Sequence, residues 1–242
     1  MAEKCEEIMH LDDLEIFIYR KKTKYMRLRI GLTPPNLSPT LMANLAQNLF
    51  KQAPKPPYIS LTCPKVASAE QLRAFATHNL PWIRQTRAKI VQKSQIQQEI
   101  LDAHAGEILL FGEWVPAMGL RELRGILGSY LAKRVPMLAE SMGLRFSKLG
   151  VRLSITRFGS CTIDRLSFSI LLVFATRAEI DYVIIHELAH IAHSNHSPRF
   201  WALVESYCPG CKIVRKGLRE KHRLMCLLLE RARNIDAKEN GI

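Results

Sequence analysis

Short runs of branched and aromatic residues dominate the first part of the chain. Residues 14–20 (LEIFIYR) and 25–32 (YMRLRIGL) flank the polar segment KKTK, and this pattern predicts a β-hairpin. Prolines make 33–39 a loop, and a short amphipathic helix is expected over 40–52. The sequence YISLTCP at 58–64 is typical of a third strand. We therefore expect the N-terminal region to be rich in β-structure.

Helical signals begin after these strands. Ser68 is a suitable N-cap for a helix, and Pro81 is expected to kink or divide that helix. Residues 92–105 are polar with helical character, which makes them the candidate linker. We therefore divide the chain into two parts. The first, residues 1–105, is a β-rich N-terminal region with a helical insertion and a helix, and the second domain covers 106–242.

The second domain mixes both kinds of pattern. Strand-like runs occur at 106–116, as a hairpin with the pair 112–113 at its turn, at 151–156 and at 166–174. Helix-like segments, with apolar residues three or four apart, occur at 121–142 and from Thr176 nearly to the end, with breaks near 194–198 and 208–210. Gly143 suits the end of the first of these helices. The predicted fold class is α+β.

Composition indicates a globular chain with a basic surface. The chain has 242 residues, 48% of them hydrophobic, and 35 Lys and Arg against 22 Asp and Glu, a formal net charge of +13. This excess is compatible with weak attraction to nucleic acid or other anionic partners, although a solvated basic surface is the favoured explanation. Positive charges are concentrated near the C-terminus, in a segment that we call the basic run: Lys212, Arg215, Lys216, Arg219, Lys221 and Arg223.

The sequence also argues against a membrane protein and against a secreted disulfide scaffold. It contains no run of eighteen apolar residues, and acidic residues stand near its start, where a signal peptide needs a basic end. The six cysteines are scattered and do not form a dense framework. We therefore expect free thiols, a cytoplasmic location and no membrane partner.

The segment 180–201 (IDYVIIHELAHIAHSNHSPRFW) carries the clearest chemistry. On a helix, His186 and His190 lie four residues apart on one face, where two imidazoles can bind one metal ion. Glu187 follows His186, so its carboxylate can reach a metal-bound water without being a ligand. This division of labour is typical of zinc hydrolases, in which the metal activates water and the carboxylate takes its proton.

A catalytic zinc site needs a third protein ligand and an open fourth position. His196 is one candidate, because Ser197 and Pro198 can start a new helix immediately after it and so create a turn back towards the ion. Glu205 is the rival, because many zinc peptidases take a Glu from the next helix. His193 lies off the ligand face and is expected at the surface.

The sequence resembles a known family in this region. The stretch HELAHIAHSNHSPRFW is similar to the signature of the YgjP-like metallopeptidases, relatives of the WLM and SprT-type minimal zincins, and 154–190 resembles the segment that precedes it. The resemblance implies a zincin-like domain of helix, antiparallel strands and active-site helix. It also implies one zinc ion per chain, held by His186, His190 and His196, with Glu187 as general base. The resemblance thus favours His196 over Glu205 as the third metal ligand.

Three functions follow as hypotheses. The leading one is a zinc-dependent peptidase that hydrolyses peptide bonds in peptide or protein substrates with metal-activated water. The second is a metal-dependent hydrolase of nucleotide phosphoanhydrides, although the sequence has no Gly-rich phosphate loop. The third is a nucleic-acid-associated protein with a structural zinc, although structural sites usually have four protein ligands, mostly thiolates.

Other residues are candidates for lesser roles. Tyr182 and Tyr207 could each donate a hydrogen bond to an oxyanion. The segment 157–161 (RFGSC) is either part of the substrate groove or a structural turn. The C-x-x-C at 208–211 cannot complete a tetrahedral zinc site by itself and is interpreted as a turn with free thiols.

Overall fold

The computed structural model describes residues 4–5, 7–32, 36, 38 and 57–239. The chain divides into two compact units, Met1–Ile100 and Leu101–Ile242, and each unit has a hydrophobic core of its own. The helix predicted over 40–52 and most of the predicted loop at 33–39 lie outside the described residues. Both units contain helices as well as strands, as expected for an α+β chain.

The first unit contains a sheet of strands β1 (Glu7–Leu11), β2 (Leu14–Lys21), β3 (Arg27–Gly31) and β4 (Tyr58–Pro64) in the order β1-β2-β4-β3. Strand β4 runs parallel to β2 and antiparallel to β3. The hairpin predicted between β2 and β3 is therefore wrong, because β4 lies between them. The hairpin that does form joins β1 to β2.

Burial explains why β4 takes the central place. Its residues Ile59, Leu61 and Cys63 are buried in the core of the unit. Strand β3 instead exposes Arg27 and Arg29. Charged side chains are typical of an edge strand, where they discourage pairing with further strands.

Two helices, α2 (Ala69–His78) and α3 (Leu80–Ala103), follow the sheet. Ser68 caps α2 in a complete capping box, as predicted. The helix ends at Asn79, and Pro81 lies in the first turn of α3, where its missing N–H is not needed. The prediction that Pro81 divides the helix is thus confirmed, and the polar segment predicted as a linker forms most of the second half of α3.

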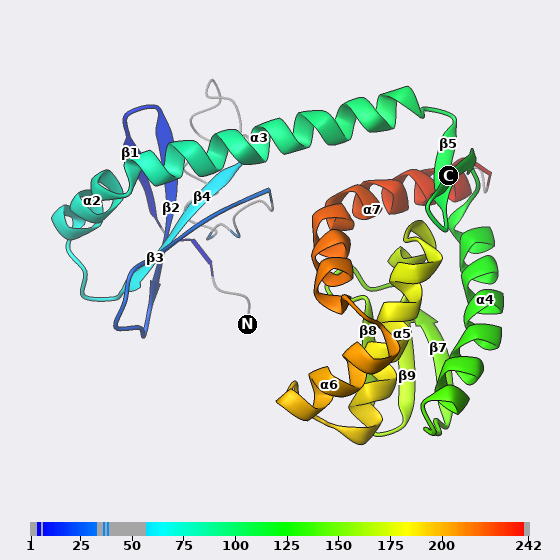
Figure 1. Ribbon diagram of the computed structural model, residues 1–242. Coiled ribbons are helices and arrows are strands. Elements are labelled where there is room, and N and C mark those ends of the chain that lie inside the picture. Colours follow the sequence, from blue (N-terminus) through cyan, green and yellow to red (C-terminus); the bar gives the residue numbers. More distant parts are fainter. Residues whose placement is uncertain (1–3, 6, 33–35, 37, 39–56, 240–242) are drawn as a thin grey trace. The chain divides into compact units, whose positions relative to one another are not determined.

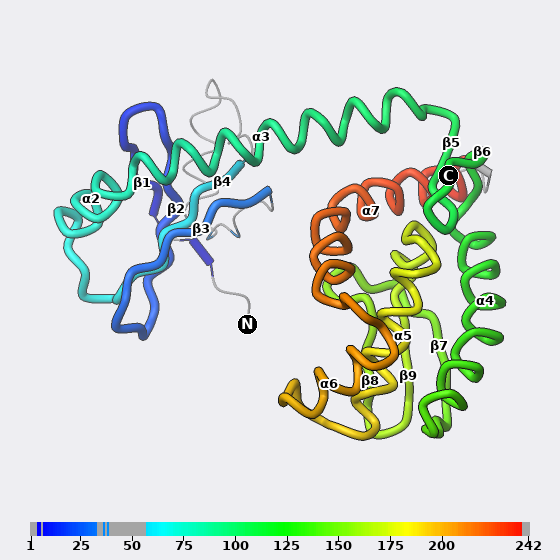
Figure 2. The backbone as a smooth tube through the Cα atoms, in the orientation of Figure 1, coloured from blue at the N-terminus to red at the C-terminus, as the bar shows by residue number. Residues whose placement is uncertain are grey.

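The second unit begins with the hairpin of β5 (Glu107–Leu110) and β6 (Glu113–Pro116) (Figure 2). Phe111 and Gly112 form its turn, with φ angles of +52° and +89°. Two consecutive positive φ angles are typical of the tight turns that match the twist of a hairpin. The hairpin is confirmed, with its turn one residue earlier than predicted.

Helix α4 (Leu120–Ser141) precedes a sheet of β7 (Lys148–Arg152), β8 (Gly159–Thr162) and β9 (Arg165–Ser169) in the order β7-β9-β8. Strand β9 is parallel to β7 and antiparallel to β8, so β8 forms one edge of this sheet. The helix predicted at 121–142 is confirmed.

The strands predicted at 151–156 and 166–174 need correction. The first strand lies earlier, at β7, and Gly159, expected in a turn, belongs to β8. Only the first half of the second run is a strand. Its second half is the 3₁₀ helix η1 (Ile170–Phe174), in which every side chain is buried. An uninterrupted apolar run is compatible with a helix that is buried on all sides as well as with a strand, so this run does not identify a strand. The Ser169 hydroxyl caps the 3₁₀ helix by accepting a hydrogen bond from the Leu171 backbone N–H.

The remaining helices are α5 (Arg177–Ala192), α6 (Pro198–Tyr207) and α7 (Cys211–Glu239), with the two predicted breaks between them. Thr176 starts α5 with a capping box. Helix α5 contacts β8, α4, α6 and α7, so it is the central helix of the unit (Figure 1). Within the described residues, no helix has the length and apolar character needed to cross a membrane.

Candidate metal centre

The end of α5 and the turn before α6 bring three histidines together. His186 and His190 lie one helical turn apart on α5, and the chain leaves the helix at His193, which has an extended backbone. Ser197 then caps α6 and so fixes the turn that carries His196. One nitrogen of each of His186, His190 and His196 lies within 4.8 Å of the others. We call this group the histidine cluster.

The spacing of the nitrogens fits a metal ion. Nε2 of His186 lies 3.2 Å from Nε2 of His196. Two ligands of a tetrahedral zinc, with Zn–N bonds of roughly 2.0–2.1 Å, are separated by about 3.3 Å. Nδ1 of His190 lies 3.2 Å from the carbonyl oxygen of His193, which can only accept a hydrogen bond. His190 therefore carries its proton on Nδ1 and has a free lone pair on Nε2, as a metal ligand requires.

The electrostatic environment favours the uncharged forms of His186 and His190. Burial, helped by the neighbouring histidines and by Arg215, lowers the pKa of His186 to about 3. Burial also lowers the pKa of His190. Neutral imidazole is the form that binds metal ions, and a set of three imidazoles suits zinc and related transition metals better than calcium or magnesium. The residues present therefore fit the ion that the sequence implies.

Two aromatic residues of α6 support the histidine cluster. Phe200 is fully buried, and its ring centroid lies 4.9, 4.6 and 4.8 Å from those of His186, His190 and His196. Trp201 stacks on His196 at 5.6 Å with an interplanar angle of 23°. Sequence analysis missed both roles, although the Ser197 cap fixes the first turn of α6, which contains both residues.

Glu187 lies beside the cluster and is only 6% exposed. Burial raises the pKa of its carboxyl group to about 7, against the opposing effects of Arg157 and of a hydrogen bond from the Cys161 backbone N–H. Glu187 and the cluster line a cavity of about 940 Å³ together with residues of β8 and the end of α5. A carboxyl group that titrates near neutral pH can both take up and release a proton there. We call the cavity lined by Glu187 and the histidine cluster the main cavity.

The segment 157–161 lies at this site, as one of its two interpretations expected. Arg157, Gly159, Ser160 and Cys161 all line the main cavity. The segment therefore forms part of the cavity wall.

Glu205, the rival third ligand, is engaged elsewhere. Its carboxylate accepts hydrogen bonds from the Gly210 backbone N–H at 2.8 Å and from the Cys211 thiol at 3.0 Å. Among the residues that the structure describes, neither Glu205 nor His193 belongs to the histidine cluster. The arrangement favours His196 as the third ligand.

The two candidate tyrosines have different surroundings. The hydroxyl of Tyr207 donates a hydrogen bond to the Ser141 carbonyl, so it serves the packing of α6 on α4. Tyr182 is buried, and its ring lies 5.9 Å from that of His186. Burial raises the pKa of Tyr182 to about 12, so its hydroxyl keeps its proton at neutral pH. Of the two candidate tyrosines, Tyr182 is therefore the one that lies next to the histidine cluster.

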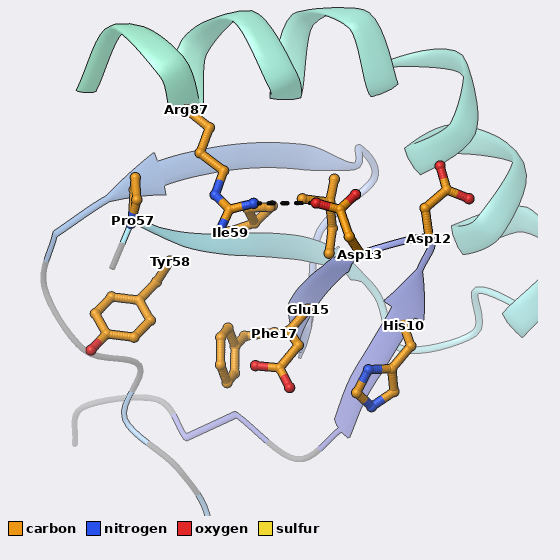
Figure 3. A pocket seen from close by; sticks show the side chains of 10 residues that line it. His10, Asp12, Asp13, Glu15, Phe17, Pro57, Tyr58, Ile59 and Arg87 are labelled. Carbon is orange, nitrogen blue, oxygen red and sulfur yellow. Dashed lines mark ion pairs between the residues drawn. The ribbon is translucent and has the colours of Figure 1, made fainter. Parts of the chain in front are cut away.

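The first unit has a cavity of its own, with a volume of about 370 Å³ (Figure 3). Two carboxylates of its lining are paired with arginines: Asp13 lies 3.7 Å from Arg87, and Asp12 lies 3.0 Å from Arg84. No group of three metal-ligating side chains occurs there among the described residues. The candidate metal centre thus belongs to the second unit.

The match to a family model agrees with this location. The family model of the YgjP-like metallopeptidase domain matches residues 113–221. The crystal structure of the metallopeptidase zymogen of Pyrococcus abyssi abylysin is similar at 21% identity and a TM-score of 0.35, covering 38% of this chain and 93% of that one. No curated protein matches the chain. The residues that match the model of the YgjP-like metallopeptidase domain, 113–221, include the histidine cluster and Glu187.

Proposed function

We propose that the protein is a zinc-dependent peptidase in which His186, His190 and His196 hold one zinc ion per chain and Glu187 is the general base. The observation that carries the proposal is the histidine cluster itself, whose ligand atoms lie within 4.8 Å of one another beside a buried carboxyl group and an open cavity. The match to a metallopeptidase family supports the peptide bond as the target.

The chain supplies positioning and proton transfer. When bound, zinc polarises the carbonyl of the cleaved bond and lowers the pKa of a water molecule. Glu187 accepts a proton from the attacking water at a carboxylate oxygen and delivers it to the leaving amine nitrogen. The Cys161 backbone N–H orients that carboxylate, and the His193 carbonyl orients His190.

The donor set also bears on the structural-zinc alternative. A structural site closes with four protein ligands, whereas three imidazoles facing a cavity leave a coordination position for water or substrate. We include a cytoplasmic location in the proposal, because the described cysteines form no disulfide. Peptide or protein substrates are included because of the match to a metallopeptidase domain.

The test compares Glu187→Gln with the wild-type chain after both are stripped of metal and reconstituted with zinc. We expect the variant to retain zinc and to lose peptide hydrolysis by roughly 10²- to 10⁴-fold on a quenched fluorescent peptide library. Glu220→Gln, at an exposed position of α7, is the matched control and keeps full activity. Full hydrolysis by zinc-loaded Glu187→Gln, or release of phosphate from nucleotides without any peptide cleavage, contradicts the proposal.

A further inference from the structure

A second cavity of about 240 Å³ lies between α5 and α7 beside the histidine cluster. It shares His186, Glu187 and His196 with the main cavity, so a group bound in it lies next to the bond that is cleaved. We call it the α7 cavity. Two arginines of α7, Arg215 and Arg219, contribute its positive charge.

Arg215 is held in place by aromatic stacking. Its guanidinium carbon lies 5.1 Å from the centroid of the Trp201 ring, and Trp201 in turn stacks on His196. Stacking occupies the face of a guanidinium and leaves its N–H edge free to donate hydrogen bonds. Arg215 is therefore a pre-positioned donor a short distance from a metal ligand.

Neither arginine is neutralised by a carboxylate of the described residues. The acidic groups close to this part of α7 pair with other cations: Glu220 with Lys216 at 4.0 Å, and Glu179 with Lys221 at 2.8 Å. In the lining of the main and α7 cavities, as the structure describes it, Glu187 is the one carboxylate, whereas Arg157 adds another positive charge. The surroundings of the cluster thus carry an excess of fixed positive charge, which favours an anionic ligand.

We propose that the α7 cavity is a substrate-specificity site that binds a carboxylate, with Arg215 and Arg219 as its donors. The carboxylate belongs to the substrate residue beside the cleaved bond, either as an Asp or Glu side chain or as a terminal carboxyl group. Arginine matches a carboxylate with two parallel hydrogen bonds, which neither a neutral amide nor an apolar side chain can satisfy. This inference rests on the proposed peptidase function.

The test uses peptides in matched pairs that differ only by Glu or Gln at one position near the cleaved bond, each made with a C-terminal acid and with a C-terminal amide. We expect kcat/KM to be roughly 10- to 100-fold higher for the Glu peptide or for the free acid, because hydrogen bonds between charged groups are worth that factor. A preference for Glu in both forms identifies the side chain, and a preference for the acid alone identifies the terminus.

Arg219→Gln is the first variant, because Arg219 is exposed and its replacement does not disturb the core. This substitution is expected to reduce the preference for the peptide that carries the carboxylate. The double substitution of Arg215→Gln and Arg219→Gln is expected to abolish that preference. Arg233→Gln is the matched control: it removes the same charge from an exposed position of α7, fourteen residues and about 21 Å further along the helix. A preference that survives the double substitution, or equal cleavage both of Glu and Gln peptides and of C-terminal acids and amides, overturns the proposal.

A binding measurement separates this inference from the peptidase function. Fluorescence anisotropy reports binding of labelled Glu and Gln peptides, each as C-terminal acid and as amide, to the metal-free chain, where no cleavage occurs. Selective binding of the Glu peptide that Arg219→Gln weakens upholds the carboxylate site even if no peptide is ever cleaved, in which case only the peptidase proposal fails. Equal binding both of Glu and Gln peptides and of C-terminal acids and amides, with or without cleavage, overturns the carboxylate site.

Discussion

Gly159 of β8 lies so close to Glu187 of α5 that any larger residue at position 159 would displace the Glu187 side chain. A Cβ atom at position 159 would lie 2.6 Å from both Cγ and Oε1 of Glu187, well inside van der Waals contact. Because Glu187 is buried, its side chain has little room to retreat. The edge strand and the helix of the histidine cluster thus approach each other at a glycine, and this approach sets the position of the carboxylate.

Gly159→Ala therefore tests the position of Glu187 without changing any charged group. We expect the variant to retain zinc and to lose about 10²-fold in kcat/KM, since a displacement near 1 Å at a reacting group costs that much. Gly125→Ala in α4 is the control, because no atom lies within 4 Å of its added Cβ. There the substitution adds about 0.5–1 kcal/mol to the free energy of unfolding and leaves activity unchanged. Full activity of Gly159→Ala would contradict the tight contact.

Metal content distinguishes the two candidates for the third ligand. We expect His196→Ala to lose zinc and Glu205→Ala to retain about one ion per chain, because Glu205 bonds to Gly210 and Cys211 instead. Plasma mass spectrometry of the purified variants measures this directly. Zinc retained by His196→Ala and lost by Glu205→Ala would reverse the assignment.

The candidate site was predictable wherever its geometry is local. The four-residue spacing of His186 and His190 determines their common face, and the Ser197-Pro198 pair marks the turn that brings His196 to them. These relations depend on the helix repeat and on capping, which short sequence patterns encode.

The parts that were not predictable depend on tertiary contacts. Arg215 and Arg219 are members of the basic run, and only the packing of α7 against α5 brings them to the cluster. Likewise, β4 enters between β2 and β3 because its alternate residues are buried, which no feature of the intervening segment indicates. Periodicity predicts the kind of element, whereas pairing between distant strands depends on how the whole core is filled.

Tyr182→Phe tests whether the buried hydroxyl next to His186 stabilises the transition state. The pKa of Tyr182 is about 12, so the hydroxyl is a hydrogen-bond donor at neutral pH. If it donates to the oxygen of the cleaved carbonyl, its loss lowers kcat by about 10²- to 10³-fold with little change in KM. Tyr207→Phe, whose hydroxyl donates to Ser141, is the control and keeps kcat. Equal kcat in the two variants would limit Tyr182 to a packing role.

Cys211 provides a test of the pH dependence of the second unit. Burial, together with the hydrogen bond to the Glu205 carboxylate and its negative charge, raises the pKa of this thiol from 9.0 to about 11. Between these values the unfolded chain has lost the thiol proton while the folded chain keeps it. The free energy of unfolding therefore falls as the pH rises from about 9 to 11, and below pH 9 this thiol does not make the stability depend on pH.

The same shift is measurable at the thiol itself, because only the thiolate reacts with iodoacetamide. We expect alkylation of Cys211, mapped by mass spectrometry, to reach half its maximal rate near pH 11. Glu205→Gln removes the carboxylate charge that opposes the thiolate, so the midpoint moves to lower pH. Glu220→Gln removes a charge from the same helix without contacting the thiol and leaves the midpoint in place. Coincident midpoints in wild type and Glu205→Gln would show that the carboxylate does not control this cysteine.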